Sequence, residues 1–270
     1  MELRFTKMNG AGNDFVVIDN RSRQFSLDGK TIARLCDRHR GVGADGLLAV
    51  EPAEGQADFR MRYYNADGGE AEMCGNGARC FARYSARLMP EKPASLSFET
   101  QAGVITAKLE GDLVSLDMGR PTDHRAPQVF DLGGASHEIH FLNTGVPHAV
   151  VFVSDVEKVD VQNLGRTIRR HEAFAPKGTN ANFAQALDPN HLVLRTYERG
   201  VEGETLACGT GVCATALLHA LATGAASPVH VTVRGGDTMR VDFTQDADGS
   251  FASAKLTGPA DFVFDGVISL

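Results

Sequence analysis

Two segments of this 270-residue chain repeat one another at a constant spacing. Residues 63–77 read YYNADGGEAEMCGNG, and residues 197–211 read YERGVEGETLACGTG. At an offset of 134 the two segments share a tyrosine, a glutamate, a cysteine and three glycines. The glycine-rich turns upstream, at 9–12 and 143–145, keep nearly the same offset. We therefore expect a duplicated domain in which each copy builds its own core.

The hydrophobic pattern predicts the same order of elements in both halves. In the first half we expect strands at 13–19, 46–50 and 59–63, helices at 26–39 and 75–88, and alternating strands from 95 to 118. In the second half we expect strands at 149–153, 192–197, 229–233, 239–243, 251–256 and 261–270, and helices at 163–170 and 208–224. The Gly-Arg-Pro break at 119–121 is a candidate crossing between the halves.

Composition narrows the possible functions. The net charge is −7 and no basic cluster stands out, which argues against nucleic acid as a partner because phosphate binding needs a positive surface. No apolar run approaches the roughly 18 residues of a membrane span, and residues 1–7 lack the apolar region of a signal peptide. The odd number of cysteines, five, then favours reduced thiols and a cytoplasmic location.

Each repeated segment places a cysteine, Cys74 or Cys208, at the glycine-rich start of a predicted helix. The first turn of a helix leaves backbone N–H groups unsatisfied and carries the positive end of the dipole. Such an end favours the thiolate form of cysteine and can hold a substrate carboxylate. Two such motifs across one pocket predict epimerisation at an α-carbon. One thiolate removes the α-proton, and the opposite thiol delivers a proton to the other face.

The cysteines also allow other interpretations. A structural zinc could use Cys74, Cys80, Cys208 and Cys213, although their C-x5-C and C-x4-C spacings lie outside the usual range. A redox dithiol is disfavoured because the sequence has no C-x-x-C. Burial as a small apolar side chain remains the better interpretation for Cys36, Cys80 and Cys213.

Six segments that run in order through nearly the whole chain form a specific pattern: 7–15, 37–45, 64–68, 73–81, 197–200 and 207–211. In these segments the chain closely resembles the diaminopimelate epimerase family. The resemblance implies an isomerase that interconverts LL- and meso-diaminopimelate, in lysine and peptidoglycan precursor biosynthesis, without pyridoxal phosphate, another cofactor or a metal. It implies an α+β fold of two pseudo-symmetric domains, each a barrel-like, mostly antiparallel sheet around a central helix. The domains would be 1–117, with 258–270 returning to them, and 118–257, and the enzyme is expected to be a homodimer.

The resemblance also implies roles for individual residues. Cys74 and Cys208 match the catalytic pair, and His148 matches a histidine near the reacting centre. The positions that match substrate binders are Asn13, Asn65, Asn180, Glu198 and Arg199, and those that match the groups holding the reacting carboxylate are Gly75, Asn76, Gly209 and Thr210. Arg199 could hold a second carboxylate with its planar fork, while Asn65 and Asn180 offer carbonyl acceptors for an ammonium group.

Two positions depart from the family pattern. Gly46 stands where a glutamine often follows the aspartate, and Val146 stands where an asparagine is common before Pro147-His148. Both belong to the substrate-binding set, so the departures leave open a related racemase of another amino acid that also works without pyridoxal phosphate. A zinc-stabilised binding protein is the alternative from a different functional class.

Overall fold

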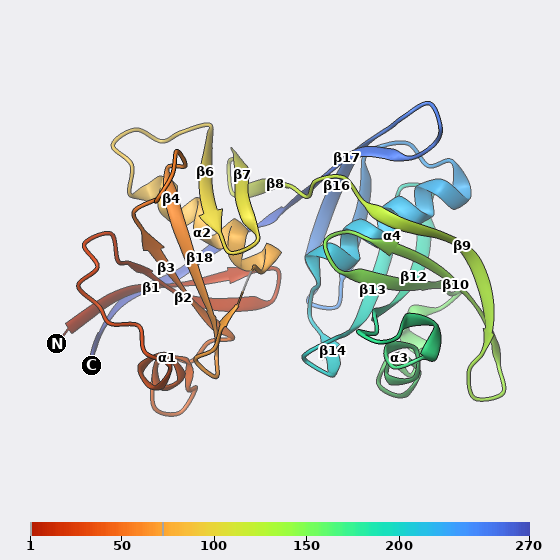
Figure 1. The fold of residues 1–270 in the computed structure, drawn as a ribbon, viewed down its shortest axis with the longest axis horizontal. Helices are drawn as coiled ribbons and strands as arrows, with labels where there is room; N and C mark the ends of the chain where they lie inside the picture. Colours follow the sequence, from red (N-terminus) through yellow and green to blue (C-terminus); the bar gives the residue numbers. More distant parts are fainter. Residues whose placement is uncertain (1, 72) are drawn as a thin grey trace. The chain divides into compact units, whose positions relative to one another are not determined.

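The computed structural model describes residues 2–71 and 73–270, which form two compact units (Figure 1). Within these residues, unit 1 runs to Leu116 and also takes in Gly258–Leu270, and unit 2 is Asp117–Thr257. In this part of the chain no helix combines the length and the apolar character that crossing a bilayer requires.

Unit 1 is a mostly antiparallel sheet with two helices in its described part. Its strands are β1 (Glu2–Gly10), β2 (Asn13–Asp19), β3 (Gly46–Glu51), β4 (Phe59–Asn65), β5 (Glu70–Ala71), β6 (Ser95–Thr100), β7 (Gly103–Glu110), β8 (Leu113–Asp117) and β18 (Asp261–Ser269). Helix α1 (Gly29–Cys36) connects β2 to the parallel strand β3, and helix α2 (Gly75–Arg87) connects β4 to the parallel strand β6.

Unit 2 repeats this plan. Its strands are β9 (Thr122–Asp131), β10 (Ser136–Asn143), β11 (Pro147–Phe152), β12 (Asn180–Asp188), β13 (His191–Glu198), β14 (Gly203–Thr205), β15 (Val229–Val233), β16 (Thr238–Gln245) and β17 (Phe251–Pro259). Helices α3 (Val161–Arg169) and α4 (Gly209–Thr223) and the short 3-10 turns η1 (Val156–Lys158) and η2 (Glu172–Phe174) complete it.

Strand pairing makes the duplication explicit. The β2–β3 pair is parallel, as is β11–β12, and in both cases a helix lies in the connection. The β4–β6 pair and the β13–β15 pair are parallel across the second helix of each unit. The pairs β3–β4 and β12–β13 are antiparallel, like the remaining hairpins. The repeat in the sequence is therefore also a repeat of these strand pairings.

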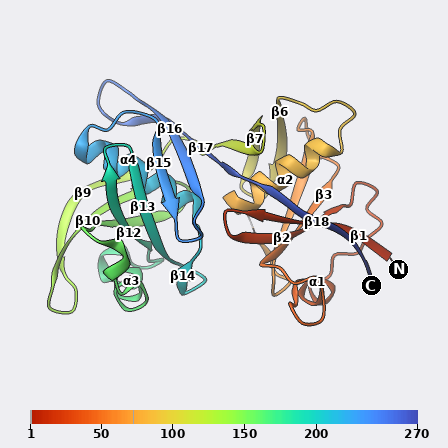
Figure 2. The same ribbon diagram turned by 180° about the vertical axis from the view of Figure 1, so that it is seen from behind.

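A helix occupies the middle of each unit's sheet, α2 in unit 1 and α4 in unit 2 (Figure 2). In α2, Phe81 is fully buried and its ring centroid lies 4.8 Å from that of Phe98 on β6. The buried side chains of α4 are mostly short, including Cys213, Ala214 and Ala216, and its C-terminus ends on Gly224 in the left-handed conformation. Most residues of both central helices are therefore buried within their own units.

The last strand, β18, pairs with the first strand, β1, along almost its whole length (Figure 2). The register runs from Glu2 opposite Ser269 to Asn9 opposite Asp261, with one irregularity after Lys7. In unit 2 the corresponding place beside β10 is taken by β9, which directly precedes it. Unit 1 thus needs both ends of the described chain to complete its sheet.

The predicted helix at 26–39 is shorter in the structure, where α1 is Gly29–Cys36. The Asp28 carboxylate accepts hydrogen bonds from the backbone N–H groups of Lys30 and Thr31, both at 3.0 Å, and so fixes the start. At the other end Asp37 is extended, and the chain turns away. The apolar periodicity located the helix, whereas a capping carboxylate set its first residue.

Candidate functional site

The helix start at Cys74 is open to a ligand. Cys74 is the extended residue before α2, and its carbonyl accepts from the N–H of Ala78 at 2.7 Å. In the described residues no atom would lie within 4 Å of a Cβ built on Gly75. The N–H groups of this first turn can therefore be approached closely by an anion.

The fully buried side chain of Arg79 forms hydrogen bonds to the first turn of α2. Asn76 donates through Nδ2 to Oδ1 of Asn13, at 2.7 Å, and accepts through Oδ1 from Arg79, at 2.9 Å. Arg79 also donates to the carbonyls of Pro259, at 3.1 Å, and Gly75, at 3.4 Å. Asn13 and Asn76, two predicted binders, are thus brought into direct contact, and Arg79 acquires a structural role.

Asn13 is held in turn by a charged network. Its Nδ2 donates to Asp45 at 3.0 Å, and Arg38 bridges Asp45 and Asp14. Lys7 is buried and its ammonium lies 2.6 Å from Asp14. Burial acts to raise the pKa of Asp14, but the hydrogen bonds from Arg38 and Lys7 lower this pKa to about 2. The network fixes the amide of Asn13 through Asp45, which Arg38 holds in turn.

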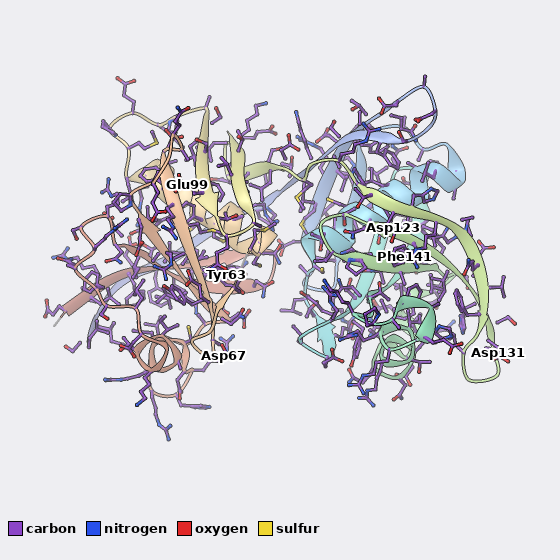
Figure 3. All side chains as sticks on the ribbon, in the orientation of Figure 1. Tyr63, Asp67, Glu99, Asp123, Asp131 and Phe141 are labelled. Carbon is purple, nitrogen blue, oxygen red and sulfur yellow. The ribbon has the colours of Figure 1, made fainter. Side chains whose placement is uncertain are left out.

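Tyr63 fills the space that a side chain at position 46 would take. A Cβ built on Gly46 would lie 2.9 Å from Cε2 of Tyr63 and 2.5 Å from the carbonyl oxygen of Tyr64. The Tyr63 hydroxyl, on the residue labelled in Figure 3, donates to Oδ1 of Asn65 at 2.8 Å. The departure at Gly46 is therefore accompanied by an aromatic ring whose hydroxyl orients the predicted binder Asn65.

Strand register gathers the predicted residues of unit 1 at one end of its sheet. Phe15 on β2 lies opposite Gly46 on β3, and Gly46 lies opposite Asn65 on β4. Asn13 begins β2 at this same end and contacts the first turn of α2. Asn13, Asn65 and the helix start at Cys74 therefore share one end of unit 1.

Unit 2 places the second cysteine at an equivalent helix start. Cys208 is the extended residue before α4, is 7% exposed, and its carbonyl accepts from the N–H of Val212 at 2.9 Å. Its Sγ lies 3.5 Å from Oγ1 of Thr210, whose carbonyl accepts from the hydroxyl of Thr144. Gly209, the first residue of α4, is buried. The Cys208 sulfur therefore has a hydroxyl group within hydrogen-bonding distance.

His148 and Asn182 lie behind Thr210. His148 is fully buried, with Nε2 2.9 Å from Oγ1 of Thr210 and Nδ1 3.2 Å from Nδ2 of Asn182. Burial, and then the charge of Arg199, lower the pKa of His148 to about 3. The imidazole is consequently neutral at physiological pH and serves as a hydrogen-bonding group, not as a cation.

The remaining predicted binders meet at the end of β13. Asn180 accepts from the backbone N–H of Arg199 at 2.8 Å and donates to the carbonyl of Pro147 at 3.2 Å. Glu198 accepts from the hydroxyl of Thr205 at 2.9 Å, and burial raises its pKa. Asn65 and Asn180, predicted as acceptors for an ammonium group, each already accept one hydrogen bond, which leaves one lone pair on each carbonyl.

All five cysteines are thiols, and Cys36, Cys80 and Cys213 are buried as predicted. Burial raises the pKa of Cys36 to about 11 and that of Cys80 to about 12, so neither ionises readily. Within residues 2–71 and 73–270 no group of three or more His, Cys, Asp or Glu side chains is arranged to hold a metal ion. The zinc alternative thus has no ligand cluster in the described chain.

Sequence reasoning gave no role to Lys7, Tyr63 or Asn182. Asn182 had a recognisable signal, because an asparagine within the apolar run Ala-Asn-Phe-Ala of a buried strand must find partners. Lys7 opens the segment 7–15 and Tyr63 is the tyrosine that the two repeats share, but neither pattern indicates a role, since a lysine and a tyrosine in strands usually reach solvent.

The family model and the curated relatives that match this chain carry the same name. A family model described as diaminopimelate epimerase matches residues 5–123 and 140–263. A diaminopimelate epimerase of Nitrosospira multiformis is 45% identical over 100% of this chain and 99% of its own length. One of Aquifex aeolicus is 43% identical over 99% of this chain and 98% of its own length.

Solved structures resemble the chain in fold. A Bacillus anthracis phenazine biosynthesis protein of the PhzF family gives a TM-score of 0.75 at 17% identity, over 100% of both chains. A probable proline racemase from Agrobacterium radiobacter gives 0.70 at 17% identity, over 99% of this chain and 93% of the other. These likenesses concern the fold alone, and with the observed topology they confirm the predicted α+β fold of two similar domains.

Proposed function

Because the chain belongs to the diaminopimelate epimerase family, we propose that Cys74 and Cys208 are the two acid–base groups of its reaction. As a member of this family the chain is an isomerase that epimerises diaminopimelate, a small-molecule substrate. The observation that carries the thiol assignment is the duplication: each cysteine directly precedes the central helix of its own unit.

In the proposed reaction the substrate carboxylate binds the backbone N–H groups of the helix starts at Gly75-Asn76 and Gly209-Thr210. A cysteine thiolate takes the α-proton, so the C–H bond breaks and an S–H bond forms. The electron pair moves into the carboxylate, where the N–H donors stabilise the enolate-like charge. The second thiol then protonates the other face of the α-carbon and becomes the thiolate. LL- and meso-diaminopimelate are interconverted, and the α-hydrogen is exchanged with solvent.

The second amino acid head of diaminopimelate needs its own partners. We assign its carboxylate to Arg199, whose guanidinium can form a bidentate contact, and its ammonium to Glu198 and the remaining lone pairs of Asn65 and Asn180. The partial burial of Glu198 supports this assignment, because an ammonium partner would compensate the burial that raises its pKa. The domains 1–117 with 258–270 and 118–257 would each contribute one cysteine.

Deuterium wash-in tests the thiol assignment. Diaminopimelate is incubated with the enzyme in D₂O beside a panel of other L-amino acids, and α-deuterium is followed by mass spectrometry. Wild-type enzyme should label diaminopimelate, whereas Cys74→Ala and Cys208→Ala should each abolish epimerisation. Cys36→Ala, in a thiol that burial keeps protonated, is the matched control. Full epimerisation by either active-site variant would disprove the two-thiol mechanism, and labelling of another amino acid alone would indicate a different racemase.

We further propose a cytoplasmic homodimer. The mechanism needs two reduced cysteines, which a reducing compartment preserves. The strand β18 supports self-association, since Val263, Phe264 and Val267 are 49–56% exposed along it. Light scattering across a concentration series should give twice the monomer mass for the wild type. The Val263→Lys variant should give a lower mass. A monomer at all concentrations would contradict the dimer.

A further inference from the structure

We infer that Asn182 is a positioning residue, which fixes the tautomer of His148 so that the Thr210 hydroxyl donates its proton to the sulfur of Cys208. This inference rests on the proposed role of Cys208 and concerns only contacts within unit 2. It assigns a task to a buried side chain that touches neither the reacting sulfur nor the proposed substrate site.

The amide of Asn182 can adopt one orientation only. Its Nδ2 lies 3.0 Å from the carbonyl oxygen of Ala149, which can only accept, so Nδ2 must be the donating end. Its Oδ1 accepts from the hydroxyl of Thr196 at 3.0 Å. Asn182 is fully buried, so no water competes for these partners. The Ala149 carbonyl therefore determines which end of the amide faces His148.

This orientation determines the proton on the imidazole. Nδ2 of Asn182 also faces Nδ1 of His148, at 3.2 Å, so Nδ1 must accept and carries no proton. A neutral imidazole then has its proton on Nε2. His148 stays neutral because burial lowers its pKa to about 3, and the nearby charge of Arg199 acts in the same direction. The tautomer is thus imposed by the strand β12 and not by the substrate.

The Nε2 proton in turn directs the hydroxyl of Thr210. Nε2–H donates to Oγ1 of Thr210 at 2.9 Å, so the hydroxyl accepts on that side and its own proton points elsewhere. Sγ of Cys208 lies 3.5 Å from the same oxygen, within the range for a hydrogen bond to sulfur. The hydroxyl can therefore donate to Sγ, which stabilises the thiolate over the thiol. Asn182, His148, Thr210 and Cys208 form one directed chain of donors.

The equivalent position in unit 1 is built differently. At the repeat offset of 134, Thr210 corresponds to Asn76. The amide of Asn76 is engaged by Asn13 and by Arg79, and it brings no hydroxyl group to its helix start. The two cysteines thus have unlike surroundings in an otherwise duplicated fold. The hydroxyl donor favours the thiolate form of Cys208.

The first measurement is the tautomer itself. In protein with ¹⁵N-labelled histidine, the His148 signals are identified by their loss in His148→Gln. Nδ1 should resonate as an unprotonated nitrogen and Nε2 as a protonated one, well above the pKa of about 3. Asn182→Asp puts an acceptor opposite Nδ1 and should move the proton to Nδ1, whereas Thr196→Val should leave it on Nε2. A protonated Nδ1 in the wild type would overturn the inference.

The second measurement is the reactivity of Cys208. Iodoacetamide is applied at neutral pH without substrate, and modification of the Cys208 peptide is followed by mass spectrometry. Thr210→Val should react about tenfold more slowly, because it removes a hydrogen bond to a charged group, and Thr210→Ser should restore the rate. Asn182→Asp should slow the reaction similarly, and the Asn182→Asp/Thr210→Val double variant should be no slower than Thr210→Val.

If iodoacetamide modified Cys208 in Thr210→Val as fast as in the wild type, that result would also overturn the inference. If Asn182→Asp does not fold, the Thr210→Val and Thr210→Ser pair still decides it. Neither measurement uses diaminopimelate, so the two proposals can be told apart. The measurements can contradict the series of hydrogen bonds from Asn182 to Cys208 while deuterium wash-in still shows that both cysteines are required. Conversely, they can support this series of hydrogen bonds while wash-in disproves the two-thiol reaction.

Discussion

Two glycines near the proposed site serve opposite needs. Gly46 has no side chain because Tyr63 and the Tyr64 carbonyl already fill the space beside it, whereas Gly75 faces open space. One glycine is thus required for packing, and the other gives a ligand access to the helix start.

Alanine at these two positions should separate stability from binding. Gly46→Ala would place its Cβ 2.5 Å from a backbone oxygen, so we expect a loss of about 1–3 kcal/mol in the free energy of unfolding by urea. Gly75→Ala should unfold at the wild-type midpoint or above it, since alanine favours a helix by about 0.5–1 kcal/mol. Its KM for diaminopimelate should rise. Equal midpoints for Gly46→Ala and the wild type would contradict the packing argument.

The buried His148 should make stability depend on pH. Its pKa is 6.5 as an ordinary histidine and about 3 in the fold. Between these values the unfolded chain binds a proton that the folded chain does not, so the folded state loses stability as pH falls from 6.5 towards 3. His148→Gln should lose less stability over this interval in urea unfolding at successive pH values. If the free energies of unfolding of the two proteins changed with pH in parallel, protonation of His148 would not destabilise the folded state.

The sequence could identify residues whose pattern repeats, such as Cys74 and Cys208. It could not identify the orientation of the Asn182 amide or the neutral state of His148. Both depend on which carbonyls and hydroxyls the strands bring within about 3 Å, and that follows from the register of β11, β12 and β13.

At the scale of elements, the Arg79 guanidinium ties the first turn of α2 to the rest of unit 1. Arg79 is fully buried and joins the first turn of α2 to the carbonyl of Pro259, at the end of β17. The helix start that carries Cys74 is therefore positioned from its buried side, and its open side remains for a ligand.

Replacing Arg79 should cost stability. Arg79→Met leaves the carbonyls of Pro259 and Gly75 without this donor in a buried place, so we expect a loss of about 1–3 kcal/mol in chemical unfolding. Arg40→Met is the control, because the Arg40 side chain is 83% exposed and lies 3.8 Å from its acidic partner. An equal effect of the two substitutions would mean that Arg79 contributes only its volume.

Element prediction succeeded where the pattern is strong. The strand at 13–19 coincides with β2, and the helix at 75–88 with α2 to within one residue. No strand was predicted for β1, β5, β9, β10, β12 or β14. β9 is exposed along nearly its whole length, so it has no apolar alternation to detect. β12 is buried over its first five residues, so its burial does not alternate there, although Asn180 and Asn182 are polar.

At the scale of the molecule, unit 1 depends on residues 258–270 for its sheet. Removing residues 261–270 would expose the N–H and C=O groups of β1 and part of the surface around Leu3 and Phe5. Limited proteolysis of this truncated protein should cut first within residues 2–116, while 117–257 resists longer. The full-length chain should resist over both ranges. Earlier cleavage in 117–257 would show that the two units are not independently stable.

The pairing of β18 with β1 also bears on how the protein is made. A ribosome synthesises a chain from its N-terminus to its C-terminus, so residues 117–257 emerge before β18 has been synthesised. Unit 2 can complete its sheet at that stage, because β9 already lies next to β10 in the sequence. Unit 1 must wait for its final strand with the edge of β1 uncovered. During synthesis the second copy of the repeat is therefore the first to mature, the reverse of the usual N-terminal-first order.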